Sequence, residues 1–253
     1  MKMLKKIILA AVLVVGFVFA QNSMKFGAHA AGSIGTAWGS NTDLIEIGWG
    51  GGFNVGVDAK FVVNPKFSVI AGVAADYRRV FWDYGAFFKK MLSPYMTEEY
   101  GYGPQYEDMV KKLFSIEATF SFLYVDVPVI ARMNLAPNFF LDAGIDLGFN
   151  VIASVSSKVD GKEESDDIES SMVSAVDFAL ITGLGYSITD NIDVYFRAVF
   201  GLVNMIDFDK ATTDGPGTTN SYYDDDDDDD YESSLKYDFK NMRFQLGVTF
   251  WFL

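Results

Sequence analysis

The strongest constraint on the fold is an alternation of apolar and polar residues with a period of two. In one clear stretch the apolar members are Phe53, Val55, Val57, Ala59, Phe61 and Val63, and the residues between them include Asn54, Gly56, Asp58 and Lys60. Such alternation places the two classes on opposite faces of a β-strand. Similar patterns predict strands at residues 24–38, 53–63, 67–77, 116–133, 139–149, 173–188, 192–205 and 238–252. The chain is therefore expected to be all-β.

The connections between these eight strands alternate strictly between short and long. Short connections fall at residues 64–65, 135–138 and 189–191, and long ones at residues 39–50, 81–115, 156–172 and 206–237. This order is typical of an antiparallel up-and-down barrel that has tight turns at one rim and long loops at the other. Within the fourth strand the apolar parity changes near Phe122 to Val125, so we expect a bulge or a shorter strand there.

Alternation alone also fits a soluble barrel with an apolar interior. Two further observations favour an apolar outside. The polar positions carry both signs of charge among many glycines, which suits a lumen better than a solvated coat: Lys25, Asp58, Lys60, Asp76, Arg78, Asp126, Arg132, Asp142, Asp146, Asp177, Asp193, Arg197 and Arg243. Aromatic residues gather at the strand ends, as they do at the two membrane interfaces. The sequence thus predicts an eight-stranded antiparallel transmembrane β-barrel with short periplasmic turns and long extracellular loops.

The first 20 residues are expected to be a cleaved signal peptide. Lys2, Lys5 and Lys6 precede an apolar run over residues 7–19, and Val18 and Ala20 fit a cleavage site. The remaining residues, 21–253, are then one outer-membrane barrel domain. The chain has no cysteine, which excludes disulfides and thiolate metal sites. Its formal charge of −14 argues against nucleic acid as a partner, because phosphate contacts require lysine and arginine.

Several short motifs resemble the PorT-like outer-membrane β-barrel domain family. They occur in this order: Tyr124-Val125-Asp126-Val127-Pro128-Val129-Ile130-Ala131-Arg132, Gly183-Leu184-Gly185-Tyr186, Arg197 to Asn204, and Asn241 to Phe252. The closing Phe250-Trp251-Phe252-Leu253 also resembles the aromatic assembly signal of bacterial outer-membrane barrels. The resemblance implies an eight-stranded barrel in the outer membrane of a Gram-negative bacterium, and it implies little about activity.

No residues are predicted to be catalytic, to bind a cofactor or to ligate a metal. Motifs such as G-x-S-x-G, H-E-x-x-H and the P-loop are absent from the sequence. His29, the single histidine, has lumen parity and is expected to be structural. Eight strands enclose an interior just wide enough for side chains to fill. We therefore expect a non-enzymatic barrel with a structural or surface-interaction role. A narrow channel for ions or small solutes, and an accessory component of a secretion or assembly machine, are alternatives.

The acidity of the chain is concentrated in two predicted outer loops. Residues 156–172 contain six acids and two lysines, and residues 206–237 contain eleven acids and two lysines, including the run Asp224 to Asp230. No D-x-D-x-D-G spacing organises this run into a preformed calcium site. Besides membrane lipid, the expected partners are therefore an extracellular ligand or loosely associated cations at the acidic loops.

Overall fold

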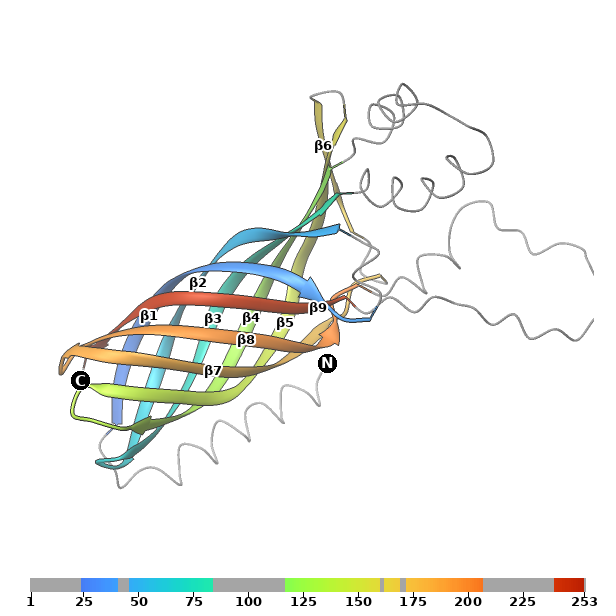
Figure 1. Ribbon diagram of the computed structural model, residues 1–253. Helices are drawn as coiled ribbons and strands as arrows, with labels where there is room; N and C mark the ends of the chain where they lie inside the picture. The colour runs from blue at the N-terminus through green and yellow to red at the C-terminus, as the bar shows by residue number, and fades with distance from the viewer. Residues whose placement is uncertain are drawn as a thin grey trace, which may run out of the picture.

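The computed structural model describes residues 24–40, 46–83, 117–159, 162–168, 172–206 and 239–252. Within these residues eight long antiparallel strands form a closed barrel (Figure 1). They are β1 (Met24–Trp38), β2 (Glu46–Asn64), β3 (Phe67–Asp83), β4 (Glu117–Asn134), β5 (Phe139–Val159), β7 (Val176–Thr189), β8 (Ile192–Asn204) and β9 (Lys240–Phe252). Each strand pairs with its neighbours along the chain, and β9 closes the sheet by pairing with β1. The predicted fold class is confirmed.

Three strands extend further than the alternation indicates. β2 begins at Glu46, β3 continues to Asp83, and β5 reaches Val159, so three of the predicted long connections are shorter than expected. The beginning of β2 was missed because Gly50, Gly51 and Gly52 supply no apolar side chains to alternate. A short strand, β6 (Lys162–Asp167), was not predicted either; it pairs with the far end of β5 and takes no part in closing the barrel.

The expectation of a bulge or a shorter strand in β4 is wrong: β4 runs unbroken from Glu117 to Asn134 and pairs with β3 in a constant register. The apolar parity changes because Phe120, Phe122 and Tyr124 are buried inside the barrel. The register shift opposite Leu123 and Tyr124 comes from one extra residue on β5, Val151.

The three glycines of β2 form a second irregularity, where the register with β3 shifts between Trp49 and Phe53. A Cβ atom at Gly50 would lie 2.1 Å from the backbone oxygen of Arg79, whereas one at Gly51 would meet nothing within 4 Å. β2 therefore approaches β3 too closely for any side chain at Gly50. A bulge of this kind leaves one extra residue on one strand and bends it locally.

Apolar side chains face the outside of the barrel and polar side chains face its interior, as the alternation predicts. Apolar side chains are exposed around the outside of the barrel, among them Val55 (44%), Val57 (59%), Val73 (50%), Leu180 (46%) and Leu246 (69%). Several aromatic residues near the strand ends are also exposed: Phe26, Phe67, Tyr186, Phe250 and Phe252 at the turn side, and Trp38, Trp49, Phe53 and Phe81 at the loop side. Phe61 differs from this pattern, because it is buried.

β5 is much longer than a membrane requires. A tilted strand crosses the hydrocarbon in about 9–11 residues, and β5 has 21. Its outward apolar side chains continue to Val151 and Ile152, and polar residues follow from Ser154. The last part of β5 and its partner β6 therefore lie beyond the apolar belt, and Figure 1 shows β6 beyond one end of the barrel. No helix among the described residues is long and apolar enough to span a membrane.

The predicted signal peptide at residues 1–20 and the aspartate run Asp224 to Asp230 lie outside the described residues. The same holds for most of the two longest predicted loops, residues 84–116 and 207–238. Expectations about these segments stay predictions.

Candidate functional site

Charged side chains converge in the lumen of the barrel. Of the thirteen polar-face residues named from the sequence, eleven are buried, while Lys25 and Lys60 are half-buried near the turn-side rim. Ten of the eleven buried charged side chains form two groups at different depths, and the eleventh, Asp58, pairs with His29. We call the two groups the turn-side cluster (Arg132, Arg197, Asp142, Asp193) and the loop-side cluster (Asp76, Arg78, Asp126, Asp146, Asp177, Arg243).

The turn-side cluster is organised around Asp142, close to the beginning of β5. The Arg132 guanidinium donates to both of its carboxylate oxygens, from Nε at 2.8 Å and from Nη2 at 3.1 Å. Arg197 on β8 donates to Asp142 Oδ2 from Nη2 at 3.0 Å and from Nε at 3.2 Å. Arg132 Nη1 also donates to Asp193 at 2.5 Å, and Asp193 accepts a further bond from Trp251 Nε1 at 2.7 Å. Two arginines therefore meet two aspartates, with every contact inside the barrel.

Aromatic rings hold these two guanidinium groups in place. The Arg132 guanidinium lies 3.4 Å from the ring centroid of Phe140, and that of Arg197 lies 3.9 Å from Tyr195. Cation–π contacts of this kind are strongest when both partners are removed from water. The rings thus compensate part of the cost of burying the arginines and restrict the geometry of their ion pairs.

The loop-side cluster has a different composition, because four aspartates surround two arginines. Arg78 on β3 donates to Asp76 at 2.5 Å, to Asp177 at 2.6 Å and to Asp126 at 2.9 and 3.0 Å. Arg243 on β9 donates from Nη2 to Asp126 at 3.0 Å and to Asp146 at 2.9 Å. Its Nη1 atom also lies 3.1 Å from Asp76. Five strands supply these six side chains, because Asp76 and Arg78 are both on β3.

The charge balance of the two clusters therefore differs. With all carboxylates ionised, the turn-side cluster is neutral, and the loop-side cluster carries two more negative than positive charges. Asp146 and Asp177 each use only Oδ2 toward an arginine, and their Oδ1 atoms are buried without a hydrogen-bond partner. Burying unpaired charge is costly, so the loop-side cluster is the electrostatically strained part of the lumen.

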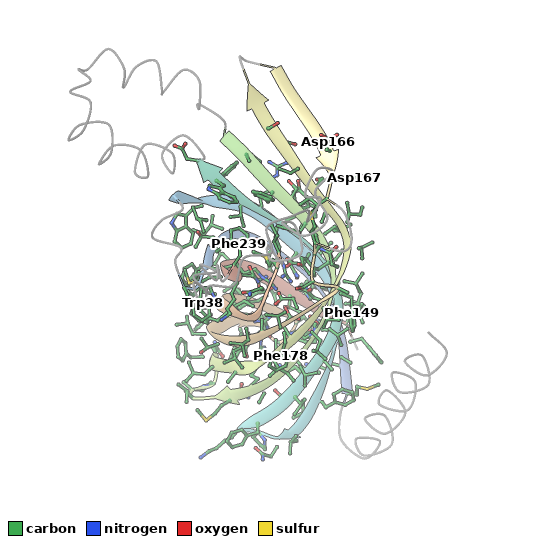
Figure 2. All side chains as sticks on the ribbon, turned by 90° about the vertical axis from the view of Figure 1, so that its right-hand side faces the viewer. Trp38, Phe149, Asp166, Asp167, Phe178 and Phe239 are labelled. Carbon is green, nitrogen blue, oxygen red and sulfur yellow. The ribbon has the colours of Figure 1, made fainter. Side chains whose placement is uncertain are left out.

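Apolar layers separate and cover the two clusters. Between them lie Ile70, Ile130, Ala179, Ile181 and Val199, all buried. Toward the long connections, beyond Arg78 and Asp126, the lumen is filled by a larger set that we call the apolar plug: Ala37, Val80, Trp82, Ala118, Phe120, Phe122, Tyr124, Ala153, Val173, Met205, Ile206 and Phe239. Figure 2 shows side chains crowding the interior over the length of the barrel. The lumen is therefore packed, as the sequence predicts for eight strands.

His29 lies in the lumen and is bonded at both ring nitrogens. Its Nδ1 atom is 2.7 Å from Asp58 Oδ2, and its Nε2 atom is 2.7 Å from Asn54 Oδ1. Both partners come from β2, directly beside β1, and all three residues are buried. Neither partner is a hydroxyl or thiol that the imidazole could activate, so the contacts fit the structural role that the sequence suggests. The alternation of apolar and polar residues predicts that His29 points inward, but it does not identify Asn54 as its partner.

Among the described residues, no three or more His, Asp or Glu side chains are grouped so that they could hold a metal ion. The four aspartates of the loop-side cluster face arginines instead. The charged side chains of the lumen bind one another tightly. At Asp146 and Asp177 the lumen also presents buried carboxylate oxygen atoms that receive no hydrogen bond from the protein.

No curated protein matches the chain. Solved structures that are similar to it include Ail, the attachment invasion locus protein of Yersinia pestis, with 12% identity, coverage of 90% of this chain and 98% of that one, and a TM-score of 0.42. Neisserial surface protein A shares 12% identity, with coverage of 91% and 99% and a TM-score of 0.43. OprG from Pseudomonas aeruginosa shares 10% identity, with coverage of 91% and 97% and a TM-score of 0.38.

A family model described as outer membrane protein beta-barrel domain matches residues 19–207, which is well over half of the chain. The matched range contains β1 to β8 of the barrel described above. The protein therefore belongs to the outer membrane protein beta-barrel domain family and is located in the cell outer membrane.

Proposed function

We propose that this protein is a sealed barrel that anchors an extracellular interaction surface in the outer membrane. The observation that carries the proposal is the packing of the lumen. Two ionic clusters alternate with two apolar layers, and the apolar plug closes the loop-side end. A barrel whose interior is filled in this way offers no wide path for solutes. The surface available for interactions is then the part that extends outside the membrane, where β5 and β6 project.

The plug supports this role because it contacts the loop-side cluster directly. The Tyr124 ring lies 4.0 Å from the Arg78 guanidinium, and Phe122, two residues earlier on β4, is fully buried. Phe120 packs on Phe239 with ring centroids 6.2 Å apart. The plug thus connects β4 to the segment just before β9, which holds the rim in one arrangement. A rigid rim is what an interaction surface needs.

Planar-bilayer recording of the refolded protein tests the sealed lumen. The wild-type barrel is expected to leave the membrane silent. The double variant Phe122→Ala, Phe239→Ala removes two plug rings and serves as the positive control, because any conductance it shows must pass through the opened end. Single-channel steps from the wild type would overturn the proposal. For the interaction role, a strain that lacks the protein is expected to lose surface attachment, and unchanged attachment would remove the support for it.

A narrow cation channel is the second candidate, and one observation favours it. The surplus of carboxylates in the loop-side cluster attracts cations and repels anions. If wild-type channels appear, this candidate requires cation selectivity that falls in the double variant Asp146→Asn, Asp177→Asn. Channels without selectivity would point to leakage through a damaged barrel instead.

The order of the sequence motifs supports a finer proposal, membership of the PorT-like branch of outer-membrane barrels. With it comes a third candidate, an accessory component of a secretion or assembly machine. Affinity capture of the tagged protein from cross-linked envelopes tests this candidate. Recovery of a defined envelope complex would support it, and capture of the barrel alone would count against it.

We further propose that the protein is not an enzyme. The support is the arrangement at His29, where both ring nitrogens already contact Asp58 and Asn54. A hydrolytic centre would need one of these nitrogens to reach a nucleophile. An activity that is lost in the variant His29→Ala while the barrel stays folded would contradict this proposal.

A further inference from the structure

The hairpin formed by β5 and β6 stands apart from the rest of the barrel. Residues 154–159 of β5 pair with residues 162–167 of β6, from Ser154 opposite Asp167 to Val159 opposite Lys162. On its other side this part of β5 pairs with β4, where Glu117 lies opposite Lys158. β6 is thus the outermost strand of a three-stranded extension, visible above the barrel in Figure 1 and marked by Asp166 and Asp167 in Figure 2.

The register shows which backbone groups of β6 are already used. Just after β6, Ile168 donates its backbone N–H to the Ala153 oxygen at 3.0 Å. In an antiparallel pair, alternate residues direct both backbone groups toward the partner strand. Asp166, Glu164 and Lys162 therefore face β5, and the N–H and C=O groups of Glu163, Ser165 and Asp167 point to the opposite edge. In the part of the chain that the structure describes, no strand pairs with that edge.

An unpaired edge of this kind is a template for a further strand. The side chains of β6 decide which strand it accepts. Its sequence, Lys-Glu-Glu-Ser-Asp-Asp, contains four acids and one lysine. Because neighbouring residues point to opposite faces, Ser165 and Asp167 share one face, and Asp166 lies on the other. Ser165, Asp166 and Asp167 are exposed.

We propose that the free edge of β6 binds an extended, basic polypeptide segment of a partner protein by strand addition. This inference rests on the surface-interaction role proposed above and names the partner class. Main-chain hydrogen bonds to Glu163, Ser165 and Asp167 hold the segment, and its lysine or arginine side chains meet the carboxylates of Asp166 and Asp167, which lie on opposite faces. A second copy of β6 is a poor occupant, because its own carboxylates would lie beside those of the first.

The test uses the full-length protein refolded in lipid vesicles and a fluorescent ten-residue peptide of alternating lysine and valine. Binding is expected to weaken at least tenfold when salt is raised from 50 mM to 500 mM, since exposed charges are screened. On binding, the amides of residues 163, 165 and 167 are expected to gain protection from hydrogen exchange. The same peptide with proline at alternate positions cannot donate along the edge and is expected not to bind.

Matched variants separate the backbone contribution from the side-chain contribution. Ser165→Pro removes the central donor on the free edge, and we expect at least tenfold weaker binding, whereas Ser165→Ala keeps the N–H and is expected to bind as the wild type does. Protection of the Ile168 amide shows whether the hairpin persists in each variant. If the proline variant loses the hairpin, the double variant Asp166→Asn, Asp167→Asn tests the electrostatic part of the inference instead. Peptide binding by this variant is expected to be at least threefold weaker and to depend less on salt.

Three results would overturn the inference. They are equal binding by the Ser165→Pro and Ser165→Ala variants with the hairpin intact, salt-independent binding, and protection of the three edge amides before any peptide is added. The last result would mean that another part of this chain or a second copy already covers the edge. Loss of attachment in a strain that lacks the protein, together with no peptide binding, would leave the proposed function standing and refute only the strand-addition surface.

Discussion

The different charge balance of the two lumen clusters predicts that the same chemical change has different effects at two depths. Asp142 and Asp146 are both on β5, both buried, and four residues apart. Asp142 accepts hydrogen bonds from two arginines in a neutral cluster. Asp146 accepts from one arginine in a cluster with surplus carboxylates. Replacing each by asparagine removes one negative charge with little change in volume.

For Asp142→Asn, the structure indicates a large loss. Four donor contacts at 2.8, 3.1, 3.0 and 3.2 Å would meet a neutral amide, whose NH₂ group opposes one of the guanidiniums. The change leaves the turn-side cluster with two buried arginines and one aspartate. Removing one partner from a buried ion pair typically costs about 3–5 kcal/mol, and we expect the free energy of unfolding to fall by about that amount.

For Asp146→Asn, the loss is expected to be about 1 kcal/mol or less. One contact at 2.9 Å weakens, but the amide oxygen can still accept it, and Arg243 keeps Asp126 and Asp76 as partners. The surplus negative charge of the loop-side cluster also decreases, which opposes the loss. Weakening this hydrogen bond to a charged group would by itself cost about 1.5–3 kcal/mol at most. The decrease in surplus negative charge offsets part of that cost.

Equilibrium unfolding by guanidinium in lipid vesicles, followed by tryptophan fluorescence and by heat-modifiable gel migration, measures both variants. Asp190→Asn, at an exposed turn position, is the matched control and is expected to behave as the wild type does. The reasoning is refuted if Asp146→Asn costs as much as Asp142→Asn, because the charge balance would then not govern the lumen.

Two further predictions concern the barrel wall. Arginine at the lipid-facing Val55 is expected to lower the free energy of unfolding by about 2–4 kcal/mol near the bilayer midplane, measured in the same assay, with Val55→Leu as the neutral control; no difference between the two would refute the assigned outer face. Gly50→Ala is expected to destabilise by about 2 kcal/mol or more, since its Cβ would lie 2.1 Å from the Arg79 oxygen, whereas Gly51→Ala has open space and is expected to be neutral. Equal effects at the two glycines would contradict the described bulge.

Much of the fold can be predicted from the sequence because a barrel strand has only two faces. The alternation from Phe53 to Val63 assigns each side chain to lipid or lumen, and the bounds of β1 are recovered from the pattern without error. The bulge predicted in β4 is wrong, because the parity change reflects apolar side chains inside the barrel at Phe120, Phe122 and Tyr124, and the extra residue is Val151 of β5.

The structural features that the sequence pattern did not predict share a physical cause. Outside the membrane a strand no longer separates lipid from lumen, so both faces of β6 are polar and the alternation disappears. The glycine bulge in β2 has no side chains from which a period could be read. The partners within the lumen are likewise hidden, because parity places Arg78 and Asp177 inside but carries no information on depth, and their contact spans 99 residues of sequence.

The position of Arg243 has a consequence for the order in which the barrel can assemble. Its partners Asp126 and Asp146 lie 117 and 97 residues earlier in the chain, and it is carried by the strand that also pairs with β1. Until β9 arrives, four aspartates at this depth share the single guanidinium of Arg78. The step that closes the seam thus also delivers the second counter-charge. The last strand and the second arginine therefore join the barrel in one event, which disfavours a half-closed intermediate.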